Sequence, residues 1–135
     1  MKTIIRIEHE TGNGIYNARK NGNIIFGSHS KAKDIEERHS TNEYPTLFGD
    51  RVLYKKMIKA IGGNYEYKLA HQYFFAFNNL NQFEKAFKRS EMQELFDLGF
   101  NVKLIEVSSC LNSKFQVIFL KKDIVNEKII NDLFI

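Results

Sequence analysis

The hydrophobic pattern is most distinct in residues 71–87, and the rest of the chain must be organised around this stretch. It opens with an aromatic run at residues 73–77, Tyr-Phe-Phe-Ala-Phe, which is rich in side chains that fill a pleated, buried surface. This pattern predicts a central β-strand. The strand is expected to end at Asn78 and Asn79, because asparagine side chains bond nearby backbone groups and favour turns and caps.

A helix is predicted directly after that strand. Asn79 is a suitable N-cap, and Gln82 follows three residues later. Leu80, Phe83 and Phe87 recur at a spacing that places them on one helix face. The helix must fold back to bury this face on the sheet that contains the strand, so other segments must supply the rest of the sheet.

Further strands are predicted where short apolar runs alternate with polar residues. We expect them at residues 3–8, 23–26, 100–107 and 115–120. Cap residues mark three more helices. These helices are expected to follow Asp50, Ser90 and Asp123, and Gly62 and Gly99 end the first two. A weaker helix is predicted at residues 30–39, followed by a loop that continues to Asp50.

Length and composition bound the fold class. The chain has 135 residues, 43% of them hydrophobic, with twelve Phe and six Tyr, which is enough for one core. The element order predicts a single α+β domain over residues 1–135, in which helices pack on a mixed or antiparallel sheet. Cys110 is the only cysteine, so an internal disulfide is excluded and a reducing cytoplasm is expected. Neither a membrane span nor a secretion signal is expected, because no apolar run approaches roughly 20 residues.

The balance of charge suggests partners of two kinds. The formal net charge is +4 and the pI is about 9.1, values that suit contact with nucleic acid or with an acidic protein. The alternative is that the lysines only solvate the surface, because charges of both signs are mixed along the chain. Nucleic acid is the less favoured partner, since the Phe residues follow core periodicity and do not alternate with basic residues as a stacking platform requires.

Two charged residues of the first strand are candidates for a site. Arg6 and Glu8 alternate with Ile5 and Ile7, so their side chains lie on the same face. One interpretation is an exposed edge with an ion pair that contributes less than about 1 kcal/mol. The other is an arginine that lines a cleft and binds an anion.

The loops hold further candidates. Gly12 and Gly14 permit unusual backbone angles, but their spacing fits a turn better than a phosphate-binding loop. His39 lies in a loop between ordered elements, where sites are frequent, although a lone histidine is more often structural. No spacing of the four histidines is typical of a metal site, and none is expected.

The order of these motifs resembles a family of small phage and prophage proteins. The resemblance covers most of the chain, although each motif is short. The matching positions are Arg6, Glu8, Gly12, Gly14 and Tyr16, then His39, Pro45 and Asp50, then residues 75–83, 95–100 and 116–119.

The strand order also resembles the ADP-ribosyltransferase-like fold, which implies NAD as cofactor. On this resemblance Arg6 would meet the NAD diphosphate or ribose, Tyr16 or Tyr73 would stack on the nicotinamide, and His39 would join the cofactor site. Gln116 would occupy the position of the catalytic glutamate. Gln116 lacks the charge that stabilises the departing nicotinamide, so Glu8 could substitute, or the fold could serve binding alone. Gln116 also fits an ordinary strand residue that pairs across the sheet.

Three functions follow as expectations. The first is an NAD-binding domain of ADP-ribosyltransferase type, enzymatic or not, that acts for a phage on a host target. The second is a non-enzymatic inhibitor that binds and blocks a host defence protein, as anti-CRISPR and similar anti-defence proteins do. The third is a nucleic-acid-binding module. All three place the protein in the host cytoplasm, with a host protein as the favoured partner.

Overall fold

The computed structural model describes residues 1–12, 19–20, 23–24 and 50–135. Tyr16, His39, the weaker helix expected at residues 30–39 and most of the loop after it lie outside the described residues. The strands are β1 (Lys2–His9), β2 (Arg19–Lys20), β3 (Asn23–Ile24), β4 (Tyr73–Ala76), β5 (Phe100–Val107), β6 (Leu111–Asn112), β7 (Val117–Leu120) and β8 (Ile124–Ile129). The helices are α2 (Arg51–Ala60), α3 (Tyr67–Ala70), α4 (Leu80–Ala86) and α5 (Arg89–Asp97), with 3-10 turns η1 (Lys121–Asp123) and η2 (Asn131–Phe134).

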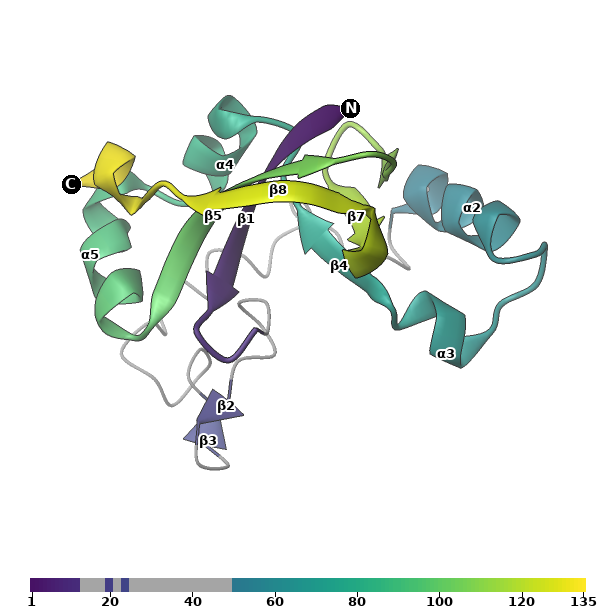
Figure 1. Ribbon diagram of the computed structural model, residues 1–135, viewed down its shortest axis with the longest axis horizontal. Helices are drawn as coiled ribbons and strands as arrows, with labels where there is room; N and C mark the ends of the chain where they lie inside the picture. The colour runs from purple at the N-terminus through teal and green to yellow at the C-terminus, as the bar shows by residue number, and fades with distance from the viewer. Residues whose placement is uncertain (13–18, 21–22, 25–49) are drawn as a thin grey trace.

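Two antiparallel three-stranded sheets form the framework, as Figure 1 shows. Their strand orders are β1-β5-β8 and β4-β7-β6. A single bridge joins the sheets, where Ile5 of β1 and Phe77, next to β4, exchange backbone hydrogen bonds of 3.1 and 2.7 Å. The aromatic segment therefore forms a strand that links the two sheets of an antiparallel α+β fold. β4 lies at the edge of its own sheet, and only Ala76 in it is buried while Phe75 is 42% exposed, so the prediction of a buried central strand is wrong.

The larger core lies between the β1-β5-β8 sheet and the helices α4 and α5 (Figure 1). Asn79 caps α4 by accepting a 2.8 Å hydrogen bond from the backbone N–H of Gln82, as predicted. The capped helix presents Phe83 and Phe87 to the sheet, and their rings stack with centroids 5.2 Å apart. Burial of this aromatic face is the main apolar contribution of α4 to folding.

A smaller core fastens α2 to the second sheet. Leu53 and Met57 of α2 are fully buried and pack with Ile118 of β7. Asp50 caps α2 as predicted, because its carboxylate accepts a 3.2 Å hydrogen bond from Leu53 N–H. Gly63, with a φ of 97°, donates to the Ile58 carbonyl at 2.9 Å and ends the helix.

The prediction of a closing helix after Asp123 is wrong. The segment forms η1, then strand β8, and only the short turn η2 is helical. Ile124, Val125 and Ile129 are β-branched and therefore favour a strand. The outer edge of β5 provides the partner, with Lys103 opposite Ile129. Tertiary pairing thus overrides an apolar spacing that also fits a helix.

Smaller differences concern helix starts. α5 begins earlier than expected, with Lys88 at the N-cap, where its backbone N–H donates to the Glu91 carboxylate at 3.2 Å. The short helix α3, capped by Glu66, was not predicted. None of the helices in the described part of the chain is long and apolar enough to cross a bilayer.

Candidate functional site

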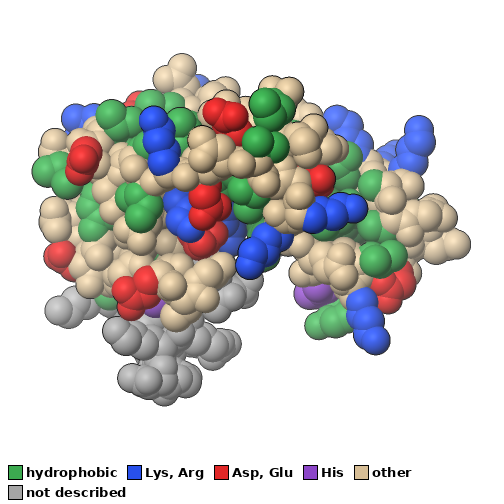
Figure 2. Space-filling view, viewed as in Figure 1, with side chains coloured by type: hydrophobic (Ala, Val, Ile, Leu, Met, Phe, Trp, Pro, Cys, Tyr) green, Lys and Arg blue, Asp and Glu red, His purple; other side chains and the backbone are tan. Residues whose placement is uncertain are grey.

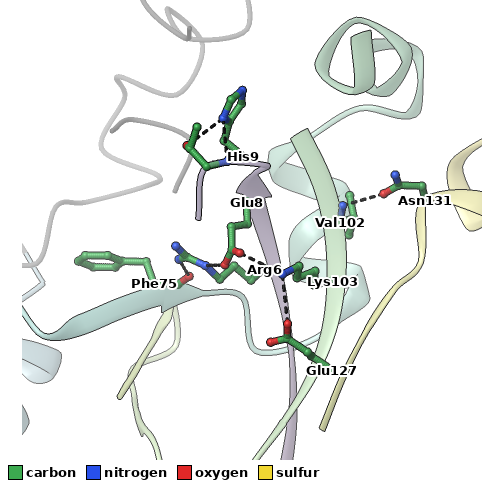
Figure 3. A network of polar contacts seen from close by, with 9 residues as sticks. Arg6, Glu8, His9, Phe75, Val102, Lys103, Glu127 and Asn131 are labelled. Atoms are coloured by element: carbon green, nitrogen blue, oxygen red, sulfur yellow. Dashed lines mark hydrogen bonds and ion pairs between the residues drawn. The ribbon is translucent and has the colours of Figure 1, made fainter. Parts of the chain in front are cut away.

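Four charged side chains of alternating sign cross the first sheet, and Figure 3 shows how they meet. The Arg6 guanidinium donates to the Glu8 carboxylate at 2.8 Å. The Lys103 ammonium binds the other oxygen of Glu8 at 3.0 Å and the carboxylate of Glu127 at 3.2 Å. We call these four residues the charged ladder. It ties β1, β5 and β8 together on one face of the sheet.

Arg6 is buried at the junction between the two sheets. Its side chain is only 4% exposed, so the interpretation of an exposed edge is wrong, although the ion pair with Glu8 is confirmed. The guanidinium donates to the Phe75 carbonyl at 2.6 Å and lies 5.0 Å from the centre of the Phe74 ring. Burial lowers the pKa of Arg6, and the bond to Glu8 opposes that change. These internal contacts make Arg6 a clamp between β1 and β4.

Lys103 is the centre of the ladder. Burial alone would lower its pKa, but the ion pairs with Glu8 and Glu127 outweigh burial and raise it. The ladder therefore keeps Lys103 charged and holds both carboxylates in place. This arrangement suits a structural role, because each charged group already has a partner of opposite sign.

Gln116 belongs to a second polar cluster. Its amide donates to Asp50 at 3.1 Å, and the Ser113 hydroxyl donates to the same carboxylate oxygen at 2.5 Å. Asp50 and Ser113 are both buried. The same carboxylate caps α2, so this cluster joins the start of α2 to the turn between β6 and β7.

His9 is fully buried at the end of β1. The Thr11 backbone N–H donates to its Nδ1 at 3.2 Å, so the ring proton is on Nε2 and is donated to the Leu98 carbonyl at 3.0 Å. Gly99 lies directly against the ring, since a Cβ at that position would be 2.9 Å from Nε2. The contacts of His9 fasten the end of β1 to the end of α5.

A hollow of about 550 Å³ opens between α2, α3, β4 and η1. Figure 1 shows α2, α3 and β4 on the same side of the molecule. Its apolar lining consists of Ala60, Ile61, Leu69, Phe74 and Leu120. The volume falls in the range of about 300–1,000 Å³ that is typical of ligand pockets.

Polar groups line the rest of the hollow. Lys121 and Lys122 are exposed, and the His71 ring contacts the Tyr67 ring at an angle of 30°, with centroids 3.8 Å apart. Tyr73 also lines the hollow, and its pKa is raised by burial and by the charge of Asp123. Aromatic walls and basic groups together are typical of a binding surface.

The segment next to the hollow carries an unusual share of charge. Residues 51–72, which contain α2 and α3 and which we call the basic arm, hold five Lys or Arg and one acidic residue. The resulting net charge of +4 equals the net charge of the whole chain, so the charges of all other residues sum to zero. All five basic side chains are exposed, and Figure 2 shows Lys and Arg side chains around this half of the molecule.

The described residues that were predicted to form one site make different contacts. Arg6 and Glu8 belong to the ladder, Gln116 binds Asp50, and Tyr73 lines the hollow. The hollow and the basic arm were missed by sequence reasoning. A count of charges in a moving window would have found the arm, but the hollow depends on the packing of α3, which has only four residues.

Comparison with known proteins gives one assignment. The model of a family described as the bacteriophage T4 Y00F protein matches residues 1–131. The chain belongs to this phage protein family. The match includes the charged ladder, the basic arm and the hollow of this Y00F-family protein. No curated protein and no solved structure matches the chain.

Proposed function

We propose that this Y00F-family protein acts by binding, without catalysis, and that its basic arm binds an acidic surface of a bacterial host protein. The observation that carries the proposal is the concentration of the net charge in residues 51–72. Complementary charge guides association and selects partners, so an acidic surface is the matching one.

Exposed apolar side chains on the arm support a protein partner. Tyr67 is 64% exposed, Tyr65 43% and Leu69 40%. Tyrosines of this kind are frequent at protein interfaces and often supply much of the binding energy. The apolar lining of the adjacent hollow favours an amino-acid side chain over a nucleobase, because a base needs polar groups that read its edge.

The contacts of the predicted catalytic and cofactor-binding residues also favour binding. Arg6, Glu8 and Gln116 all have charged or polar partners within the chain. A catalytic carboxylate at Glu8 would have to leave two ion pairs, which costs several kcal/mol when the partners are partly buried.

Capture from a host extract tests the proposal. Tagged protein should retain an acidic host protein, and Lys55→Glu should reduce that retention by about tenfold because it reverses an exposed charge on the arm. Lys128→Glu is the matched control, since it makes the same charge change on exposed β8 and should bind like the wild type. Equal retention by both variants would contradict the proposal.

Two controls separate the alternatives. Treating the extract with nuclease should not release the partner; release would assign the arm to nucleic acid. Tyr67→Ala should weaken capture by about tenfold without changing thermal stability, because an exposed anchor contributes to the interface and little to folding.

The second candidate is NAD binding of ADP-ribosyltransferase type. Its support is that Tyr73, one of the residues expected to stack on nicotinamide, lines a hollow that also has two lysines to meet phosphates. Titration with NAD, followed by the NMR signals of the hollow, tests this candidate. Saturable shifts that Tyr73→Ala abolishes would favour it, and transfer of labelled ADP-ribose to a host protein would make the protein an enzyme.

A further inference from the structure

The hollow beside the basic arm has the composition of an anchor pocket. Its apolar lining comes from three elements distant in sequence, represented by Ile61 of the α2 end, Phe74 of β4 and Leu120 of β7. Water solvates such an apolar surface poorly, so covering it with an apolar side chain is favourable. The basic groups at its border would repel a cationic segment and attract an anionic one.

Three aromatic residues, His71, Tyr73 and Phe74, line the hollow. The Nδ1–H of His71 donates to the Tyr67 carbonyl at 2.9 Å, and the two rings are in contact at an angle of 30°. Of this pair, only His71 lines the hollow. Aromatic walls favour a flat aromatic guest, because edge and face contacts add to the burial of area.

We propose that the hollow receives an aromatic side chain from an acidic, extended segment of the partner, with Lys121 and Lys122 contacting carboxylates that flank it. The proposal rests on the proposed function and specifies which part of the partner is recognised. The hollow, at about 550 Å³, has room for one aromatic side chain and part of its backbone.

Two variants of α2 give a matched test. Ala60 and Val52 are both exposed on α2, but only Ala60 lines the hollow. Ala60→Trp should fill the hollow, whereas Val52→Trp adds the same indole elsewhere on the helix. The chain has no tryptophan, so each variant also carries a single fluorophore that reports binding.

The probes are three short synthetic peptides. The first has one phenylalanine between aspartates, the second replaces phenylalanine by alanine, and the third replaces the aspartates by asparagine. The first should bind the wild type about tenfold more tightly than either of the others, since an anchor and its flanking charges each contribute. Ala60→Trp should remove the preference for phenylalanine, and Val52→Trp should keep it.

The outcomes distinguish this inference from the proposed function. Equal affinity for the phenylalanine and alanine peptides would overturn the anchor pocket and leave the basic arm intact as a binding surface. An equal loss in Ala60→Trp and Val52→Trp would also overturn it. If no aspartate peptide binds and Lys55→Glu retains the host partner, both proposals fail together. Circular dichroism of the two tryptophan variants should match the wild type, which shows that each is folded.

Discussion

The two sides of the molecule use aromatic residues in opposite ways. On the first sheet, Phe83 and Phe87 are almost fully buried and pack against each other and the strands. On the basic arm, Tyr65 and Tyr67 are exposed. On the proposed function, the first side stabilises the fold and the second side contacts the partner. Changes to the first side should therefore affect folding, and changes to the second should affect binding.

The largest expected effect tests the stable side. Phe83→Ala should lower the free energy of unfolding by about 3–5 kcal/mol, because the Phe83 side chain is fully buried and its removal leaves a cavity in the core. Urea denaturation measures the change. Phe115→Ala is the control, since that ring is 36% exposed and its loss should cost less than about 1.5 kcal/mol. Similar losses in the two variants would remove the distinction between core and surface aromatics.

The next effect tests how the arm is attached. Asp50→Ala should lower the free energy of unfolding by about 2–3 kcal/mol, because it removes the cap of α2 and the acceptor of Ser113 and Gln116. Ser113→Ala removes one of these donors and should cost less. Hydrogen exchange should show faster exchange in α2 than in α4 for the Asp50 variant. Uniform acceleration across both helices would mean that the arm and the first sheet unfold as one unit.

The third effect tests the junction between the sheets. Arg6→Met keeps the apolar stem but loses the bonds to Glu8 and the Phe75 carbonyl, and should cost about 2 kcal/mol. The Phe77 amide, which bridges to Ile5, should then exchange faster with solvent. Glu127→Gln removes the exposed end of the ladder and should change stability by less than about 0.5 kcal/mol. An unchanged Phe77 exchange rate in Arg6→Met would show that the bridge does not depend on the clamp.

Local signals in the sequence were sufficient for much of the fold. The aromatic strand, the Asn79-capped helix and the strand at residues 100–107 agree with the structure because periodicity and caps are local properties. The segment after Asp123 was misassigned because its apolar spacing fits a helix as well as an edge strand. Only the open edge of β5 decides between them, and that edge is not visible in the local pattern.

The site was harder to predict than the fold. The spacing of Arg6 and Glu8 correctly placed their side chains together, but it gave no information on burial, which depends on the approach of Phe74 and Phe75 from a distant strand. Gln116 was assigned by resemblance, whereas its partner Asp50 comes from a segment 66 residues earlier in the chain. Contacts between distant segments determine both environments, so the pattern of either strand alone does not contain them.

The smallest expected effect sharpens the comparison at the hollow itself. The pKa of Tyr73 is raised above 10.0 by burial and by Asp123, so the folded protein retains the phenol proton at a pH where the unfolded chain has lost it. The stabilising contribution is complete below pH 10.0 and is lost as the pH rises through the folded-state pKa. The pKa of Lys103 is also raised, so its contribution to stability is likewise lost at high pH. The difference in the free energy of unfolding between the wild type and Tyr73→Phe therefore isolates the contribution of Tyr73. That difference should stay below about 1 kcal/mol because solvent screens a partly exposed group.

A bound acidic peptide should move the tyrosinate absorbance of Tyr73 to still higher pH, since a nearby carboxylate disfavours the phenolate. If the peptide leaves that titration unchanged while binding persists, its carboxylates lie away from the hollow, and the contact belongs to the exposed tyrosines of the arm.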